Sequence, residues 1–413
     1  MKKTIKKPEL LAPAGTLEKL KIAIDYGADA VYIGGQGFGL RTRAGNFSFE
    51  EMQEGVAYAE RHQAKVYVAA NMVTHVDDEK GADEFFKKLA AIGIHGVIVS
   101  DPALIEICQE AAPALEVHLS TQASAVNAET LNFWQELGLK RVVLGREVTM
   151  EELKAISQNS AVDIEVFVHG AMCISYSGRC VLSNHMSLRD ANRGGCSQSC
   201  RWKYQLYDLD GAGNRRDFSG PAGEPFSMSA VDLCMLEHLP DLIENGADSL
   251  KIEGRMKSIH YVSTVVNVYR KAIDTYLADP AHYQFDPHWL DEIWKVSQRE
   301  LSTGFYYAEP TAAEQLFGPR RKRPTYTFIG EVLAYDEATK IATIRQRNHF
   351  SVGDAIEFYG PQWQTHFMQQ VEWMENEDGE RIDRAPNPMM LLTMPVTAPV
   401  RAGDMIRKKG EPA

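Results

Sequence analysis

A short pattern recurs through the first part of the chain. Residues 26–35 (YGADAVYIGG) and 245–254 (NGADSLKIEG) both contain Gly-Ala-Asp, a short apolar run and a glycine. Residues 92–102 (IGIHGVIVSDP) and 137–147 (LGLKRVVLGRE) repeat the order of helix end, glycine, apolar run and polar turn. Glycine fits the left-handed residue that ends a helix, and a short Val/Ile/Leu run is typical of a strand buried on both faces. The pattern therefore predicts helices that alternate with the strands of a parallel sheet.

Eight such strands are expected. Besides the four above, apolar runs predict strands at residues 9–12, 65–71, 116–122 and 164–169, and helical patterns occupy residues 16–26, 48–62, 83–92 and 150–158. Eight alternating units favour a (β/α)8, TIM-like barrel. An open doubly wound sheet is the alternative, which the absence of a G-x-G-x-x-G turn after the first strand disfavours.

Two departures from the repeat predict the domain organisation. The segment between the seventh and eighth strands, about residues 170–246, is long and contains the glycine- and proline-rich loop 210–225. An insertion at the C-terminal face of a barrel is where function usually lies. After Pro324, apolar and polar residues alternate between turns at 336–337 and 352–354, which predicts short antiparallel strands. We expect a catalytic barrel over residues 1–320 and a small β-barrel domain over 324–410, with RNA binding as its candidate role.

Composition narrows the class of protein. The net charge of −12 among 413 residues argues against a general nucleic-acid coat. The basic run at residues 320–323 is either a local basic patch or a solvated linker. No apolar run approaches the roughly 20 residues of a membrane-spanning helix, so we expect a cytoplasmic protein. Because thiols stay reduced in the cytoplasm, clustered cysteines there indicate metal binding or chemistry rather than disulfides.

Four of the six cysteines are crowded into one glycine- and serine-rich stretch, with the spacing C-x6-C-x15-C-x3-C. They are Cys173, Cys180, Cys196 and Cys200. Four thiolates on loops suit a metal ion or an iron–sulfur cluster. The C-x2-C knuckles of zinc ribbons are absent, which favours a cluster over structural zinc, with unligated redox thiols as a third alternative. Glycines at 178, 194 and 195 would let the backbone pass close to a cluster. Cys108 and Cys234 lie in helical patterns among apolar residues, and we expect them to be buried.

Three segments resemble the collagenase-like peptidase family U32. Residues 165–183 (EVFVHGAMCISYSGRCVLS) match the family signature, and residues 8–15 (PELLAPAG) and 249–258 (SLKIEGRMKS) are also similar to the family. The resemblance extends over the barrel and the C-terminal segment, and so over nearly the whole chain. It is strongest to the branch of the family that hydroxylates tRNA.

The resemblance implies a function. In the hydroxylase relatives four cysteines bind a [4Fe–4S] cluster, which implies this role for the four clustered cysteines here. The tRNA branch forms 5-hydroxyuridine at the anticodon wobble position and depends on prephenate. The implied partners are prephenate, the tRNA anticodon stem-loop and, as a further candidate, a paralogous family member.

Other functions stay open at this point. They are a peptidase, a hydroxylase of ribosomal RNA or of a quinone, and a non-catalytic RNA-binding protein with structural zinc. The sequence contains no H-E-x-x-H and no G-x-S-x-G motif, which disfavours the peptidase.

Strand alternation predicts the catalytic candidates. His118, Glu165, His169 and Glu253 are expected to point into the barrel, because apolar residues at the alternate positions face the helices. Of these, His169, His118 and Glu253 are the candidates. His169 ends the seventh strand, four residues before Cys173, where it could act as general acid or base. The alternative is a core histidine that holds the loop by hydrogen bonds. Glu165 lies deeper and is expected to be a buried, paired carboxylate.

Polar and cationic residues at strand ends are the substrate-binding candidates. Prephenate carries two carboxylates, and arginine pairs with a carboxylate through two parallel hydrogen bonds. Each cation could instead form a surface ion pair, but together they predict a cationic mouth in an acidic domain. The candidates are Arg41, Arg43, Asn71, Gln122, Arg146, Arg255 and Lys257. For RNA, Tyr176, Trp202 and Tyr204 are candidates for stacking on bases, or simply pack, and residues 320–323 and 407–409 are candidates for holding the backbone.

Overall fold

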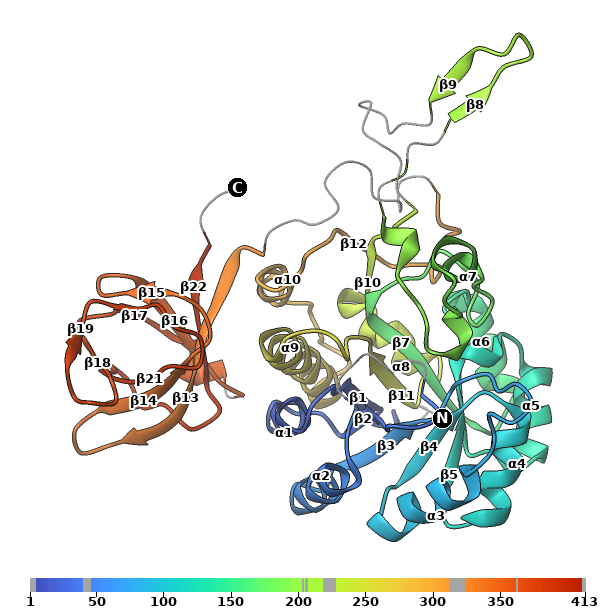
Figure 1. The fold of residues 1–413 in the computed structure, drawn as a ribbon, viewed down its shortest axis with the longest axis horizontal. Helices are drawn as coiled ribbons and strands as arrows, with labels where there is room; N and C mark the ends of the chain where they lie inside the picture. The colour runs from blue at the N-terminus through green and yellow to red at the C-terminus, as the bar shows by residue number, and fades with distance from the viewer. Residues whose placement is uncertain are drawn as a thin grey trace.

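The strand–helix units form a closed barrel in the computed structural model (Figure 1). The structure describes residues 5–39, 46–202, 204, 207–217, 228–311, 324–361 and 363–410. The eight predicted strands are confirmed as β1 Glu9–Pro13, β2 Ala30–Gly34, β3 Lys65–Ala69, β4 Gly96–Val99, β5 Glu116–Leu119, β6 Arg141–Val143, β7 Asp163–Ala171 and β11 Ser249–Ile252. Consecutive strands pair in parallel, and β11 pairs with both β7 and β1. This double pairing closes the barrel and excludes the open sheet.

Helices surround the barrel, and the sequence defines their ends. They are α1 Leu17–Asp25, α2 Phe49–Arg61, α3 Ala82–Ile92, α4 Pro102–Ala111, α5 Ala128–Glu136, α6 Met150–Asn159, α8 Leu239–Glu244, α9 Ile259–Ala278 and α10 Pro287–Trp294. Ser48 and Thr149 begin α2 and α6 with capping boxes, in which each hydroxyl accepts from the backbone three residues on. Gly93 ends α3 at φ 89°, the left-handed conformation that its pattern predicts.

A charged network fills the barrel interior toward the N-terminal ends of the strands. Glu165 is fully buried and accepts hydrogen bonds from Lys251 Nζ at 2.7 Å and from Arg141 Nη1 at 3.2 Å. Arg141 also donates to Glu9, which accepts from Tyr67 as well. Glu165 is thus the buried, paired carboxylate that the sequence predicts. A buried charged network of this kind stabilises the folded state only when every charge in it is paired, because an unpaired buried charge is costly.

The insertion adds strands to the C-terminal end of β7. The lower part of β7 pairs with β11, and its last residues pair in antiparallel fashion with β10 Asp232–Cys234, which in turn pairs with β12 Leu301–Ser302. We call residues 173–200, which carry the four clustered cysteines, the cysteine segment. It contains the short helix α7 Leu182–Ser187. It leads to a two-stranded hairpin, β8 Tyr207–Leu209 and β9 Arg215–Asp217, that projects from the molecule (Figure 1). Cys234, for which a helix was expected, lies in β10.

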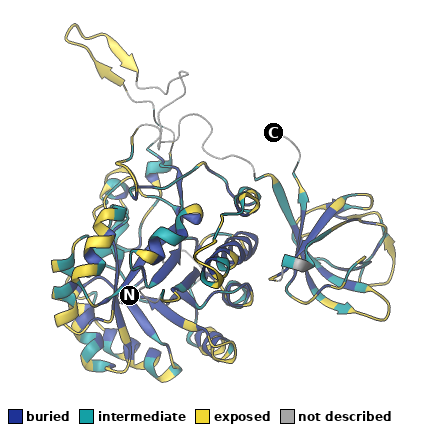
Figure 2. Cartoon of the chain, turned by 180° about the vertical axis from the view of Figure 1, so that it is seen from behind, coloured by how far each residue is buried: buried dark blue, intermediate teal, exposed yellow. Residues whose placement is uncertain are grey.

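The C-terminal residues form a separate antiparallel domain. Its strands are β13 Tyr326–Asp336, β14 Ile341–Gln346, β15 Phe350–Ser351, β16 Ala355–Tyr359, β17 Phe367–Gln370, β18 Met374–Glu375, β19 Arg381–Ile382, β20 Arg384–Ala385, β21 Leu391–Pro395 and β22 Met405–Lys409. The sheet curls around a hydrophobic core of its own, which includes Ile344, Phe350 and Phe358 (Figures 1 and 2). The predicted turns after Asp336 and around Gly353 are both present.

A polar interface joins the two domains. The hydroxyl of Tyr359 lies 2.6 Å from His260 Nδ1 and within 3.2 Å of Thr264 Oγ1 on α9. Arg407 is fully buried and donates to Glu357 and Glu292 at 2.7 Å. The prediction that residue 407 holds an RNA backbone is therefore wrong, because its guanidinium is already engaged between the domains. Residues 320–323, also predicted to contact RNA, lie outside the described residues.

The helices in the described part of the chain were compared with the requirements of a membrane-spanning helix. None of these described helices combines the length and the apolar character that crossing a lipid bilayer requires.

Candidate active site at the C-terminal mouth of the barrel

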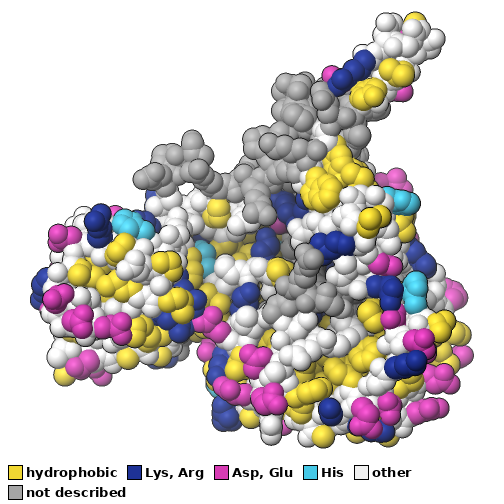
Figure 3. Space-filling view, viewed as in Figure 1, with side chains coloured by type: hydrophobic (Ala, Val, Ile, Leu, Met, Phe, Trp, Pro, Cys, Tyr) yellow, Lys and Arg dark blue, Asp and Glu magenta, His cyan; other side chains and the backbone are white. Residues whose placement is uncertain are grey.

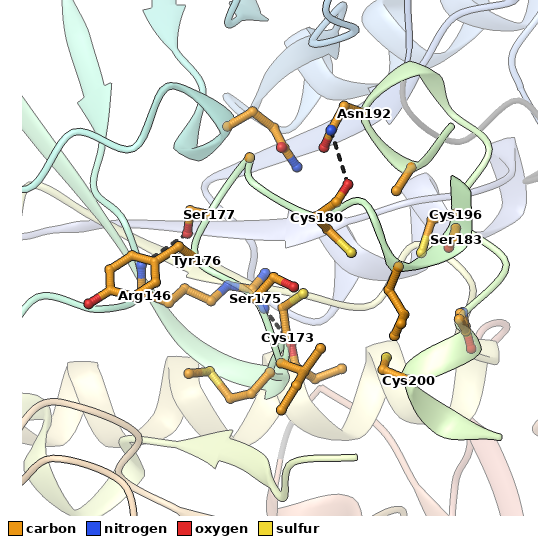
Figure 4. A pocket seen from close by; sticks show the side chains of 18 of the residues that line it. Arg146, Cys173, Ser175, Tyr176, Ser177, Cys180, Ser183, Asn192, Cys196 and Cys200 are labelled. Atoms are coloured by element: carbon orange, nitrogen blue, oxygen red, sulfur yellow. Dashed lines mark hydrogen bonds between the residues drawn. The ribbon is translucent and has the colours of Figure 1, made fainter. Parts of the chain in front are cut away.

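The cysteine segment folds over the C-terminal ends of the strands. Its four thiols all line one cavity of about 540 Å³, together with residues from the ends of β6, β7 and β11 (Figure 4). The cysteines are Cys173, Cys180, Cys196 and Cys200. The spacing in the sequence therefore corresponds to convergence in space, at the face of the barrel where active sites usually lie.

Close backbone packing positions the cysteine segment. Gly178 has φ +73°, and a Cβ there would lie 2.0 Å from the carbonyl oxygen of Gln122. A Cβ at Gly195 would lie 2.6 Å from the carbonyl oxygen of Asp190. These two glycines thus permit close contact between protein backbones, and their predicted approach to a cluster stays a prediction. Nδ2 of Asn192 donates to the Cys180 carbonyl at 3.1 Å and ties the two halves of the segment together (Figure 4).

Serine hydroxyls hold the second half of the segment against α7. The backbone N–H of Ser197 donates to Ser183 Oγ at 3.1 Å, and Ser187 Oγ donates to Ser197 Oγ at 2.9 Å. Ser183 and Ser199 are both buried, and their hydroxyls lie 3.4 Å apart. Because Ser197 directly follows Cys196 and Ser199 directly precedes Cys200, this network holds the chain next to those two cysteines.

The four cysteines line the same cavity, and their chemistry can be compared with the needs of a metal ion and of a cluster. Within the described ranges, no group of three or more His, Cys, Asp or Glu side chains has the arrangement that ligands of a single metal ion would have. Tetrahedral zinc would need four ligand atoms at about 2.0–2.3 Å from one centre. An iron–sulfur cluster instead takes its thiolates at separate iron atoms around a larger body. The all-thiol donor set fits the iron–sulfur cluster that the resemblance implies.

Two of the four thiols, those of Cys173 and Cys200, have a raised pKa. Burial raises the pKa of Cys173, and repulsion from the thiolates of Cys180 and Cys196 adds to the effect. Burial likewise raises the pKa of Cys200, with Cys173 as its next contributor. Thiols with raised pKa stay protonated near neutral pH, so a bound cation is what would stabilise the thiolates.

Four of the other predicted site residues join the cysteines in the cavity lining. They are Gln122, Arg146, Glu253 and Lys257. The guanidinium of Arg146 lies 3.9 Å from the centre of the Phe167 ring, donates to the carbonyl of Ala171, and lies 3.7 Å from Glu253 Oε2. Ammonium Nζ of Lys257 lies over the Tyr261 ring at 4.9 Å. The cavity lining therefore brings the four thiols together with Arg146, Lys257, Glu253 and Gln122.

Other predicted substrate-binding residues lie elsewhere. Nδ2 of Asn71 donates to Ser120 Oγ at 3.2 Å, outside the cavity lining. Arg255 is buried, with its guanidinium across Gly34 on β2, where a Cβ would lie 2.3 Å from Nη1. Arg41 and Arg43 lie outside the described residues.

His118 points into the barrel as predicted but lies below the cavity. It is fully buried, its ring packs edge-on against Tyr67 at 4.7 Å, and Nε2 lies 3.3 Å from Glu116 Oε2. It does not line the cavity. These contacts place it beside the charged network of the barrel interior.

His169 faces away from the barrel interior, contrary to the alternation argument. The pairing of β7 with β11 shifts register between Lys251 and Ile252, which reverses the direction of the residues that follow. Nδ1 of His169 lies 3.3 Å from the hydroxyl of Tyr269 on α9, and burial lowers the pKa of His169 to about 4. These contacts support the alternative of a neutral core histidine.

A pH titration of stability tests this role of His169. In the unfolded chain a histidine binds a proton near pH 6.5, while folded His169 stays neutral down to about pH 4. Folding stability is therefore lost as pH falls from 6.5 to 4, on the order of 2–3 kcal/mol from this group. We expect His169→Gln to show a smaller fall in melting temperature over that range, measured by circular dichroism, and to keep its activity at neutral pH. Loss of activity with unchanged stability would instead make His169 catalytic.

Several lining residues were not predicted. The carboxylate of Glu147 accepts from the Ser177 backbone N–H at 2.7 Å and from its hydroxyl at 3.1 Å, which anchors the cysteine segment to the end of β6. The sequence offers one indication of this role: Glu147 directly follows Arg146, in the turn after a strand. Of the aromatic candidates, Tyr176 lines the cavity and is exposed, whereas Tyr204 donates to the carbonyl of Ser199 at 2.6 Å.

Comparison with known proteins gives consistent matches. The family models "Peptidase family U32" and "Peptidase family U32 C-terminal domain" match residues 15–316 and 324–407. The chain is 50% identical to tRNA hydroxylation protein P1 of Bacillus subtilis (strain 168) over 403 residues, 98% of this chain and 95% of that protein. It is 35% identical to tRNA hydroxylation protein P of Escherichia coli (strain K12) over 431 residues, 94% of each chain. A 23S rRNA 5-hydroxycytidine synthase of the same organism is 37% identical over 271 residues, 66% of this chain and 40% of that protein. The chain therefore belongs to peptidase family U32.

Proposed function

We propose that the protein is a tRNA hydroxylase that forms 5-hydroxyuridine at the anticodon wobble position, with a [4Fe–4S] cluster and prephenate. The observation that carries the proposal is the convergence of four thiols on a cavity that also contains Arg146 and Lys257. The printed names of the two relatives that match almost the whole chain support tRNA hydroxylation as the reaction class.

The four cysteines would hold the cluster. Their all-sulfur donor set is the one that iron–sulfur clusters use, and the glycine contacts and serine hydrogen bonds described above preorganise the segment that bears them. When bound, the cluster supplies one-electron transfer or Lewis acidity at the cavity.

Residues of the barrel would orient the small substrates. Arg146 and Lys257 place positive charge where a dicarboxylate such as prephenate would bind, and Arg146 is held in position by the Phe167 ring and by Glu253. Gln122 offers both a donor and an acceptor, which is the chemistry that reads the edge of a uracil. A base in an anticodon loop can leave its stack at low cost, and exposed Tyr176 is positioned to stack on it.

The same cavity disfavours hydrolysis by an activated serine. No histidine is found among its described lining residues, and the Ser177 hydroxyl is bonded to Glu147 rather than to an imidazole. A serine nucleophile needs an adjacent general base of suitable pKa. We therefore do not propose a peptidase.

The test is a reconstitution with defined components. Protein purified without oxygen is incubated with unmodified tRNA, with or without prephenate, and anticodon fragments are analysed by mass spectrometry. We expect a gain of one oxygen atom on the wobble uridine only when prephenate is present. Hydroxylation of a ribosomal RNA fragment or of a quinone, with tRNA unchanged, would contradict the proposed substrate, and peptide cleavage alone would contradict the reaction.

A further inference from the structure

A second cavity lies between the barrel and the C-terminal domain. We call it the interdomain groove, and it has a volume of about 1140 Å³. It is lined by the start of α9, by the β14–β15 connection and by the ends of β13 and β22. The groove adjoins the cavity lined by the four cysteines, because both are lined by Gln198, Arg201, Met256 and Lys257.

Most of the charged residues that line the groove are cationic. Its cationic residues include Arg201, Lys257, Arg299, Arg347, Lys408 and Lys409. Asp354 is the single acidic residue among its described lining residues, and it is paired with Lys408 at 2.8 Å. Figure 3 shows Lys and Arg side chains in the hollow between the two domains. Arg299 is paired with Asp232 at 2.6 Å, but the charged lining as a whole is cationic on a chain with a net charge of −12, which favours an anionic ligand.

The cations of the C-terminal domain differ in availability. Arg347 is bound to Glu331 at 2.8 Å and also to Glu18 on the barrel, so it serves the domain interface. Lys409 is exposed at the end of β22 and makes no ion pair with any residue that the structure describes. Asn348 and His349 are exposed on the connection after β14 and line the same groove. Lys409 is thus a cation that a ligand can reach.

We propose that the interdomain groove holds the phosphate backbone of the RNA and guides one nucleoside to the thiols. The inference rests on the proposed function and assigns its substrate path. An RNA loop fits because it is a continuous strip of negative charge, and because the groove adjoins the cavity in which the base would react. Contacts of this kind position the nucleic acid without reading its sequence.

The test is RNA binding by the full-length, anaerobically purified protein, measured by fluorescence anisotropy of an anticodon stem-loop at several salt concentrations. We expect Lys409→Gln to weaken binding by about fivefold and to reduce the slope of log Kd against log salt by about 0.7–1. The loss should be the same for loops of different sequence. The matched control is Lys154→Gln, which removes an exposed lysine on α6 outside the groove, and we expect it to bind RNA as the wild type does.

The remaining outcomes separate a failure of the groove proposal from a failure of the proposed function. If the wild type binds and hydroxylates tRNA and Lys409→Gln binds with unchanged affinity and slope, the groove proposal is wrong and the proposed function stands. If the wild type binds no RNA, both are wrong. If polyglutamate displaces the RNA at similar concentration and loses the same affinity in Lys409→Gln, the groove is a surface for an acidic protein.

Discussion

Replacing Cys196 by alanine is expected to remove the iron and acid-labile sulfide of protein purified without oxygen, and to abolish hydroxylation of tRNA. Cys196 opens onto the cavity and is fixed there by the neighbouring serines. The wild type should contain about four irons and four sulfides per chain, the content of a [4Fe–4S] cluster. Loss of even a supporting partner of a metal ligand costs about 10- to 100-fold in affinity or activity, so loss of a ligand should exceed that. Metal and sulfide analysis and the tRNA assay measure both effects.

Cys108→Ala is the matched control. Cys108 is fully buried in α4, and burial raises its pKa to about 12, so it is an inert apolar side chain. The control should keep its iron and its activity at a stability cost of about 1 kcal/mol. Zinc in place of iron in the wild type, or full iron content in Cys196→Ala, would overturn the cluster proposal.

The eight strands and the cysteine cluster were predictable because their signals are local. A strand buried on both faces must be apolar throughout, and the glycine before it must end a helix, so each unit carries its own signature. Four cysteines in one loop lie close to one another whatever the rest of the chain does. Arg146 and Glu253, which the strand-end rule selects, both line the cavity, because they follow β6 and β11, the strands that neighbour β7.

The errors come from properties that depend on distant partners. His169 was assigned by counting residues along β7, but the register shift arises in its pairing with β11 and leaves no mark on the sequence of β7. Arg407 belongs to a basic run, yet its environment is set by Glu292, more than a hundred residues away on α10. Arg255 lies at a strand end, but its long side chain extends across Gly34 rather than into the cavity. A sequence pattern gives the layer in which a residue lies and not the direction of a long side chain.

Replacing Glu165 by glutamine is expected to destabilise the barrel strongly. The carboxylate is fully buried and neutralises Lys251 and Arg141, and Ser249 donates to it as well. Glutamine preserves the shape but leaves the buried cations without this negative charge, and breaking a buried ion pair costs about 3–5 kcal/mol. For a domain of this size we expect the melting temperature to fall on the order of 10 °C, measured by circular dichroism. Glu151→Gln, at an exposed position on α6, is the control and should melt as the wild type does.

The pH dependence of the difference in melting temperature between the wild type and Glu165→Gln shows whether lost charge or lost packing causes it. Burial alone would raise the pKa of Glu165, but the charges of Lys251 and Arg141 outweigh burial and hold the pKa below its ordinary value of 4.5. The contribution of the carboxylate is therefore fully present above about pH 4.5 and is lost as pH falls through the lower pKa of the folded state. The difference between wild type and variant should shrink in that acidic range, and a constant difference would assign the loss to packing instead. Since Glu165 does not line the cysteine cavity, the variant should still bind iron below its melting temperature, which separates the ion pairs that hold the barrel together from the thiols at its mouth.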